Sequence, residues 1–315
     1  MFNITQRIIR TLALAALFTI PLLPLQRAMA AFMLGGGEDY AILFQGTGGN
    51  TLQITNVTIN GNVGVADSGQ ATDSGPSTIN GRIDFSAADT GQFSNNNGAN
   101  IITGGVHYNV AAVQNAMNYV NSLSQMLFGD AGTAVAISNG TVLNASSGTT
   151  YVVNGQVVHV FDATSFGNGG NQTLTINGTA SDLVAINLDG IGNIQFHGGI
   201  LLTGGIMADN VVFNLGGGNY STHTGAASLD INNNGGTAGL AQGIFLDPNG
   251  AMDATNAEIF GRMFGGDAHD FQYVSGSTIT MPPPGVPDGG SAVALLGIAL
   301  AGIEGLRRLI HPRKA

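Results

Sequence analysis

A short motif, Thr-Ile-Asn-Gly, recurs along the chain and constrains its fold more than any other feature. Two copies begin at Thr58 and Thr78, 20 residues apart, and a third begins at Thr175. Alternating apolar residues follow the first two copies, as in short strands that bury one face. A repeat of about 20 residues with such strands has the size of one β-solenoid coil. We therefore predict an all-β fold, a right-handed β-helix of roughly 20-residue coils.

The alternation also assigns side chains to the inside and the outside of this solenoid. The residues predicted to point inward are Ile59, Val63, Val65, Ile79, Ile83 and Phe85. Thr58, Asn60, Thr78 and Asn80 are predicted to point outward and to form a binding face. A β-sandwich is the alternative, because it gives similar alternation at about 8–12-residue spacing. The matched 20-residue step favours the solenoid.

One segment has helical rather than strand spacing. Its apolar residues are Val110, Val113, Met117, Val120, Leu123 and Leu127. We expect Asn109 to cap the start of this helix and Gly129 its end. At about 1.5 Å per residue, against about 4.8 Å per coil, the helix would lie along about six coils on one flank of the solenoid.

Charge is scarce and unevenly placed. Charged residues make up 9% of the chain, against about 25% in ordinary soluble domains. All but two of the 19 acidic residues lie between residues 31 and 285, where Arg82 and Arg262 are the only basic ones. Such a surface repels nucleic acid, so we predict no nucleic-acid partner. The chain has no cysteine, which excludes disulfides and thiolate metal sites.

The first 30 residues have the pattern of a secretory signal peptide. Arg7 and Arg10 precede an apolar run at 11–25, and Ala28-Met29-Ala30 fits a small-x-small cleavage site. A buried N-terminal helix is the alternative. We predict that residues 1–30 direct export and are removed near Ala30.

The C-terminal residues form three successive parts. Residues 281–291 are a Pro/Gly-rich linker with the polar motif Val286-Pro287-Asp288-Gly289-Gly290, and residues 292–315 are a short apolar helix with a basic tail. The apolar run is marginal for a bilayer, which needs about 20 residues. A plain membrane anchor or a buried terminal helix is the alternative. We expect residues 31–280 to be one β-solenoid domain.

This C-terminal order resembles the PEP-CTERM class of bacterial sorting signals, in its Val-Pro-Asp variant. The resemblance implies transient membrane anchoring through the C-terminal helix and cleavage near the motif by an exosortase-type membrane enzyme. Asp288-Gly289 stands where the commonest form has Glu-Pro, which leaves the particular sorting enzyme open.

The order of elements in the body resembles two related bacterial groups. It runs from Asp39-Tyr40-Ala41-Ile42-Leu43 through the two coils and the helix to Ile194-Gln195-Phe196-His197-Gly198. One group is the choice-of-anchor A family of adhesive domains, and the other is the bacterial ice-binding domain of solenoid-plus-helix design. Ala66-Asp67-Ser68-Gly69 replaces the Pro-Gly-Ser turn of the ice-binding group, which favours the adhesive group. The resemblance implies a cell-surface or matrix role without catalytic residues.

Two acidic segments are candidate metal or acid–base sites. The pattern Asp230-x-Asn232-x-Asn234 matches the first half of an EF-hand-type Ca²⁺ loop, but Ala241 replaces the closing Glu. Asp267, His269 and Asp270 form a second cluster. An Asn/Gly turn and a pair of turn caps are the favoured alternatives, and His197 and His223 are expected to be ladder residues. Ca²⁺ is therefore the one candidate cofactor.

Taken together, the targeting ends and the Gly/Asn/Thr-rich body predict an exported adhesive or structural protein of the cell surface, biofilm or extracellular matrix. Its outward face would bind polysaccharide or a surface protein through many hydrogen bonds of about 1 kcal/mol each. The alternative function is ice binding through a flat Thr/Asn face. A polysaccharide-degrading β-helix enzyme is disfavoured, because such enzymes need clustered acids with Lys or Arg; we predict no enzyme activity.

Overall fold

The computed structural model describes residues 31–167, 173–188, 193–215, 228–232, 240–267 and 269–283. Residues 30–285 form one compact unit. The predicted signal peptide with Ala28 and Ala30, the motif at 286–290 and the apolar helix at 292–306 lie outside the described residues, as do Asn234 and His223.

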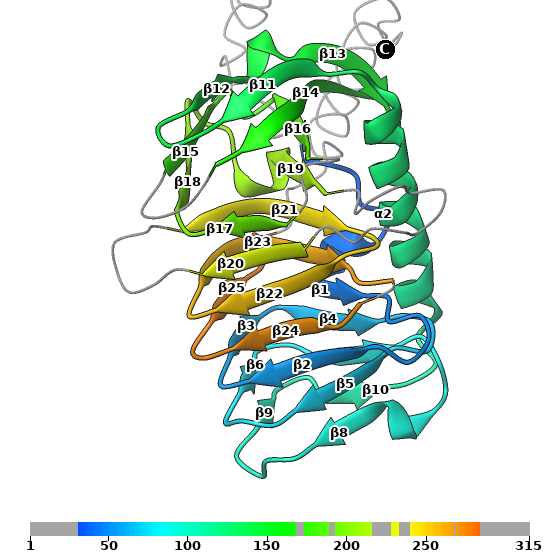
Figure 1. Cartoon of the computed structure of the whole chain (residues 1–315). Helices are drawn as coiled ribbons and strands as arrows, with labels where there is room; N and C mark the ends of the chain where they lie inside the picture. Colours follow the sequence, from blue (N-terminus) through cyan, green and yellow to red (C-terminus); the bar gives the residue numbers. More distant parts are fainter. Residues whose placement is uncertain are drawn as a thin grey trace, which may run out of the picture. The chain divides into compact units, whose positions relative to one another are not determined.

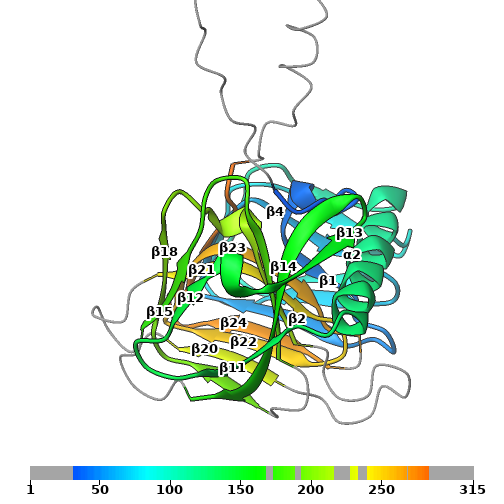
Figure 2. The same cartoon turned by 90° about the horizontal axis from the view of Figure 1, so that it is seen from above.

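The strands are arranged on three faces around a common core, as the view from above shows (Figure 2). The first face, the helix face, contains β10 (Val106–His107), β7 (Ile83–Phe85), β4 (Asn62–Val65), β1 (Tyr40–Phe44), β23 (Glu258–Gly265), β21 (Ala241–Asp247), β19 (Val211–Asn214), β16 (Leu183–Asn187), β14 (Gln156–Phe166) and β11 (Thr133–Ile137). One further strand, β13 (Thr149–Val153), pairs with β14.

The second and third faces are named here for the side chains that they expose. The Asp/Gln face contains β17 (Ile194–Phe196), β20 (Ser228–Asn232), β22 (Ala251–Thr255), β24 (Phe271–Val274), β2 (Thr51–Thr55), β5 (Gln70–Asp73) and β8 (Phe93–Asn95). The Thr/Asn face contains β12 (Val142–Asn144), β15 (Thr173–Asn177), β18 (Gly199–Thr203), β25 (Thr278–Thr280), β3 (Thr58–Asn60), β6 (Thr78–Ile79) and β9 (Ile101–Ile102), with the first residues of β21 and β23 between β18 and β25.

Successive coils pair in parallel at about the predicted repeat. Thr58 pairs with Thr78 and Val63 with Ile83. The six residues predicted to point inward are all 0% exposed. The mostly-β prediction is therefore confirmed. The β-sandwich alternative is wrong, because within the described part of the chain only β13 and β14 pair antiparallel. The handedness of the winding stays a prediction.

The winding does not follow the chain order along the stack. From β1 the chain winds to β10 at one end, and helix α2 (Ala111–Gly129) then leads to the other end. The chain winds back from there, so that β23, β24 and β25 pair with β1, β2 and β3 (Figure 1). The two halves of the sequence therefore meet in the middle of the stack.

Helix α2 confirms the predicted helical segment and packs against the helix face. It lies along β1, β23, β21, β19, β16 and β14, six successive strands of that face (Figure 1). Its buried apolar residues include Val113, Met117, Val120, Leu123 and Leu127. No helix of the described residues has the length and apolar character needed to cross a membrane.

The predicted cap of this helix is wrong. Asn109 has a left-handed backbone, with φ of 61°, and the capping position belongs to Val110, whose side chain makes no capping bond. At the other end, the Nδ2 group of Asn187 donates to the carbonyl oxygen of Leu127 over 2.8 Å. The buried amide of Asn187 thus satisfies one carbonyl in the last turn of the helix.

Four short 3₁₀ helices complete the described elements: η1 (Gly37–Asp39), η2 (Thr90–Gln92), η3 (Ala145–Ser147) and η4 (Ala208–Asn210). Arg262, on β23, is fully buried and makes two bonds to the carboxylate of Asp209 in η4, at 3.0 and 3.1 Å. Its Nη1 donates to the carbonyl oxygens of Glu38 and Tyr40. Arg262 therefore joins the N-terminal segment to the C-terminal half.

Candidate functional site

Three Thr-Ile-x tripeptides, which begin at Thr58, Thr78 and Thr278, come together on the Thr/Asn face. Thr278, Thr58, Thr78 and Ile101 are successive register partners. These four residues form one file, a row of outward side chains that runs across the strands along the stack. Two residues further along each strand, a second file lies beside it. We define the long array as these eight residues: Thr278, Thr280, Thr58, Asn60, Thr78, Asn80, Ile101 and Thr103.

The long array holds its polar side chains in place by hydrogen bonds between coils. Nδ2 of Asn60 donates to Oγ1 of Thr280 over 3.0 Å, and Nδ2 of Asn80 donates to Oδ1 of Asn60 over 2.8 Å. Neighbouring strands lie about 4.8 Å apart, and alternate residues about 6.6 Å apart along a strand. The four predicted face residues therefore belong to a regular two-row array, which Thr278 and Thr280 extend on one side and Ile101 and Thr103 on the other.

A second, shorter array occupies the same face near the other end of the stack. It consists of Val142, Asn144, Thr175, Asn177, Leu201 and Thr203. Nδ2 of Asn177 donates to Oδ1 of Asn144 over 3.0 Å, and Oγ1 of Thr203 donates to Oδ1 of Asn177 over 3.1 Å. We call it the short array. The third Thr-Ile-Asn motif, at 175–177, is part of it.

The glycine of the motif is required by the corner that follows each strand. A Cβ atom on Gly81 would lie 2.6 Å from the carbonyl carbon of Gly61 in the neighbouring coil. A Cβ atom on Gly104 would lie 2.9 Å from Cβ of Arg82. Coils approach closely enough at this corner to exclude any side chain. The recurring Asn-Gly and Thr-Gly pairs are thus a consequence of the coil geometry.

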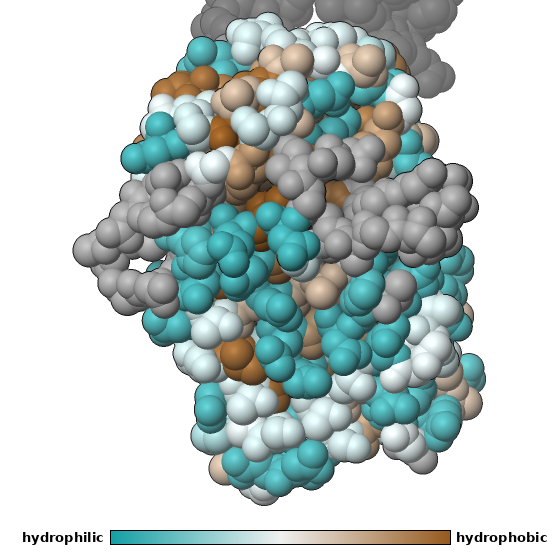
Figure 3. Space-filling model, viewed as in Figure 1, coloured by the Kyte–Doolittle hydropathy of each residue, from teal (hydrophilic) through white to brown (hydrophobic). Residues whose placement is uncertain are grey.

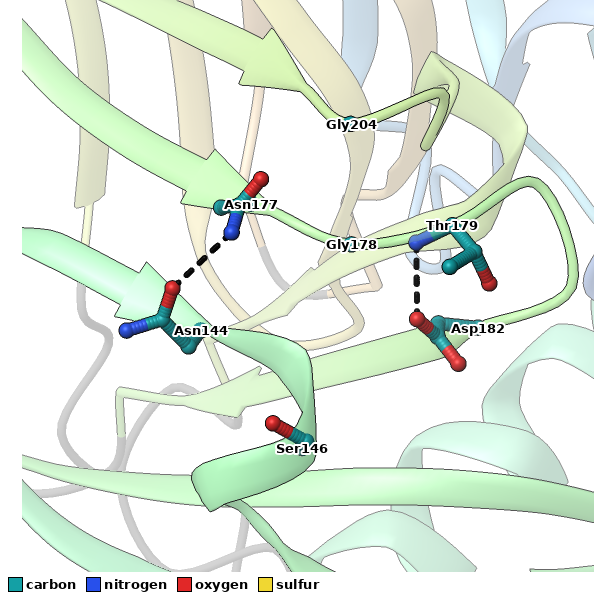
Figure 4. A pocket seen from close by; sticks show the side chains of 7 residues that line it. All are labelled: Asn144, Ser146, Asn177, Gly178, Thr179, Asp182 and Gly204. Carbon is teal, nitrogen blue, oxygen red and sulfur yellow. Dashed lines mark hydrogen bonds between the residues drawn. The ribbon is translucent and has the colours of Figure 1, made fainter.

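A small cavity of about 280 Å³ lies beside the short array (Figure 4). It is lined by Asn144, Ser146, Asn177, Gly178, Thr179, Asp182 and Gly204. Four of its residues already bond in pairs: the backbone N–H of Thr179 donates to Asp182 over 2.7 Å, and Nδ2 of Asn177 donates to Oδ1 of Asn144 over 3.0 Å. Asp182 is its single carboxylate, whereas glycoside hydrolysis uses two. The cavity therefore gives no support to the polysaccharide-degrading alternative.

The Asp/Gln face differs in chemistry from the Thr/Asn face. One outward file consists of Gln195, Asp230, Asp253, Gln272, Gln53, Thr72 and Ser94. Hydrophilic residues cover much of this face (Figure 3). Burial, together with the charges of Asp230 and Asp270, raises the pKa of Asp253. Neighbouring carboxylates therefore repel one another here.

The candidate calcium residues have a different local structure from the predicted loop. Asp230 and Asn232 lie on strand β20, where the backbone is extended, so they do not belong to an EF-hand-type turn. Across the described part of the chain, no three Asp, Glu, His or Cys side chains group as metal ligands. Calcium binding through Asp230, Asn232 and Asn234 stays a prediction.

The second acidic cluster contains a turn cap. Oδ1 of Asp270 accepts the backbone N–H of Thr51 over 2.7 Å, and the carbonyl oxygen of Asp267 accepts from Nδ2 of Asn50. Asp270 and His269 are both exposed. His197 bonds through Nδ1 to the carbonyl oxygen of Asn232 at 3.1 Å. These contacts fit structural roles.

The sequence comparisons identify the sorting signal only. A family model described as the VPDSG-CTERM motif matches residues 285–310. The chain therefore carries a C-terminal sorting motif of this type. The predicted motif residues Val286, Pro287, Asp288, Gly289 and Gly290 lie within the matched range, and their roles stay a prediction. Among curated proteins, none matches the chain by sequence.

Three solved structures with the same fold are ice-binding proteins. One, from the Antarctic ascomycete Antarctomyces psychrotrophicus, has 17% identity and a TM-score of 0.53, over 81% of this chain and 100% of its own. An ice-binding protein from an Antarctic biological consortium has 15% identity and a TM-score of 0.51, over 81% and 92%. LeIBP, from Arctic yeast, has 13% identity and a TM-score of 0.51, over 83% and 98%.

These similarities correct the preferred function. The adhesive role that the sequence favoured is wrong: the three solved structures named above, which share this fold, are ice-binding proteins. The turn at residues 66–69, which favoured the adhesive group, is a local difference within a shared fold. The chain thus has the fold of ice-binding proteins and a VPDSG-CTERM sorting motif.

Proposed function

We propose that the solenoid domain binds ice through the long array of the Thr/Asn face. The observation that carries this proposal is the pair of parallel files, uncharged and repeated at the spacing of the coils. Thr side chains present a methyl and a hydroxyl group together. A regular lattice of such groups can hold water molecules in an ordered layer that merges with an ice surface.

The internal hydrogen bonds of the array support this mechanism. Asn60 and Asn80 are already held by their neighbours in the absence of ice. Immobilising a free side chain costs about 0.5–1.5 kcal/mol, so an array that is ordered beforehand avoids much of this cost on binding. Each contact with ice contributes little, about 1 kcal/mol or less, and the number of contacts on a rigid face supplies the affinity.

The distribution of charge also favours the Thr/Asn face over the Asp/Gln face. Asp230 and Asp253 are direct register partners on the Asp/Gln face. Carboxylates bind a strong hydration shell of their own, which competes with an ordered water lattice. The long array contains no charged residue.

The test uses thermal hysteresis, the gap between the melting and freezing temperatures of a seeded ice crystal, together with inhibition of ice recrystallisation. We expect the purified segment 31–285 to show both activities. Thr78→Tyr places a bulky ring in the long array and is expected to abolish them, as is Thr58→Tyr. Thr72→Tyr is the matched control, because Thr72 lies in the same coil on the Asp/Gln face and is also partly exposed.

Two results would contradict the proposal. One is a folded wild-type protein without measurable hysteresis. The other is loss of activity in Thr72→Tyr with full activity in Thr78→Tyr, which would transfer the ice-binding role to the Asp/Gln face. Circular dichroism of each variant establishes that the fold is retained.

We further propose that the protein acts outside the cell. The sorting motif at 285–310 supports processing by an exosortase-type enzyme, with transient anchoring through the apolar segment at 292–306. Residues 1–30, 31–280 and 281–315 would then be signal peptide, ice-binding domain and sorting region. Mass spectrometry of the protein recovered from the native cell surface and medium tests this: intact residues 1–30 or an unprocessed tail would contradict it.

A further inference from the structure

We propose that Glu258 and Phe260 interrupt the ice-binding face and limit its extent. This inference rests on the proposed function and concerns the strand next to the long array. Glu258-Ile259-Phe260, at the start of β23, pairs in register with Thr278-Ile279-Thr280 of β25. Glu258 therefore occupies a Thr position of the first file, and Phe260 a position of the second.

The backbone of the face continues through this strand. Ile259 is 1% exposed, and its register partner Ile279 is 0% exposed. On its other side, β23 pairs in register with β21, where Gln242 faces Phe260. The inward packing and the strand pairing are those of an array strand, and the two outward side chains alone differ. The interruption is therefore one of side-chain chemistry.

Both side chains are unsuited to an ordered water layer. Glu258 is exposed, and it is the only charged residue that points outward on the described strands of this face. A carboxylate binds its own hydration shell. Phe260 is partly exposed, and its ring is too large to lie level with Thr and Asn side chains. The long array consequently ends at β25.

Beyond β23, the face does not resume in the same files. Nε2 of Gln242 donates to the carbonyl oxygen of Ile200 over 2.9 Å, so this side chain lies across towards β18. In β18 the next outward residue is Leu201, which is 49% exposed. The short array is thus separate. Replacing Glu258 and Phe260 of β23 with array residues would therefore lengthen only the long array, by one strand.

The experiment is a gain of activity. The double variant Glu258→Thr/Phe260→Asn converts residues 258–260 to Thr-Ile-Asn, the tripeptide of β3. We expect hysteresis to rise about twofold, because the number of simultaneous contacts with ice increases. Asp253→Thr is the matched control: it also replaces a carboxylate with Thr, on the Asp/Gln face, and is expected to leave hysteresis unchanged.

The single variant Glu258→Thr protects the test against misfolding of the double variant. It leaves Phe260 in place and is expected to give a smaller rise in hysteresis than the double variant. The variant Glu258→Gln removes the charge without adding a methyl group. Unchanged or lower hysteresis in a folded Glu258→Thr protein overturns the inference. If wild type is active and Thr78→Tyr is inactive in the same series, the proposed function stands even when this inference fails.

Discussion

Asn80 donates a hydrogen bond from Nδ2 to Oδ1 of Asn60, one coil away, over 2.8 Å. Asn60 in turn donates from its own Nδ2 to Oγ1 of Thr280 over 3.0 Å. The central amide therefore has both ends engaged along the axis of the stack. This orientation fixes its rotamer and keeps the second file of the long array level. The same relationship, between Asn177 and Asn144, orders the short array.

The first prediction concerns this amide. Asn60→Ala removes both hydrogen bonds and frees the side chains of Asn80 and Thr280, so we expect a clear loss of hysteresis. The free energy of unfolding should fall by only about 1–2 kcal/mol, since the bonds are partly exposed. Gln53→Ala is the control, because it breaks an equivalent bond to Gln272 on the Asp/Gln face. Equal loss of hysteresis in both variants would contradict the role of the long array.

The second prediction concerns the corner glycines. Gly81→Ala should lower the free energy of unfolding by more than about 1 kcal/mol, because the new Cβ would meet the backbone of Gly61. Gly98→Ala is the matched control, since nothing lies within 4 Å of a Cβ atom there. Urea unfolding followed by circular dichroism measures both. Equal midpoints would show that the coils can separate at this corner without cost.

The third prediction concerns the buried ion pair. Arg262→Ala leaves the Asp209 carboxylate buried without its partner and frees two backbone carbonyls, at Glu38 and Tyr40. Breaking such a pair costs about 3–5 kcal/mol. We expect the melting temperature to fall sharply, and the double variant Arg262→Met/Asp209→Asn to recover part of the loss. A loss below about 1 kcal/mol in Arg262→Ala would mean that the N-terminal segment is held by other contacts.

The fourth prediction is a pH dependence of stability. Asp73 is 0% exposed, and burial raises the pKa of its carboxyl from 3.8 to about 6. Between pH 4 and pH 6 the unfolded chain has already lost this proton, whereas the folded chain still holds it. The contribution of Asp73 to the free energy of unfolding is therefore largest below about pH 4 and falls as the pH rises to 6. The loss is up to about 3 kcal/mol.

Asp73→Asn removes this titration. The difference in unfolding free energy between Asp73→Asn and wild type should therefore increase in favour of the variant from pH 4 to pH 6 and level off above. Parallel urea titrations at pH 4, 5, 6 and 7 measure it. A difference that stays constant with pH would place the carboxyl in contact with solvent.

Local pattern alone determined much of the fold. Ile59 and Ile79 are inward because apolar and polar residues alternate with the period of a strand, and the stripe from Val113 to Leu127 is helical because its period is that of a helix. The outward positions of Thr58 and Asn60 follow from the same alternation. These features depend only on near neighbours in the chain, so the sequence alone predicts them. The capping position of the helix could not be predicted in this way. Asn109 has a left-handed backbone, with φ of 61°, and the capping position belongs to Val110.

Tertiary structure alone decided which coils are neighbours. Strand alternation is the same in every coil, so it does not specify that β25 stacks on β3, across 220 residues of sequence, or that β23 follows. That stacking depends on α2 carrying the chain to the far end and on Arg262 joining the two halves. It places Thr278 and Thr280 in the long array and Glu258 at its boundary. Thr58, Asn60, Thr78 and Asn80 are therefore visible in the sequence as face residues, whereas the other members of the array and its extent are a property of the folded stack.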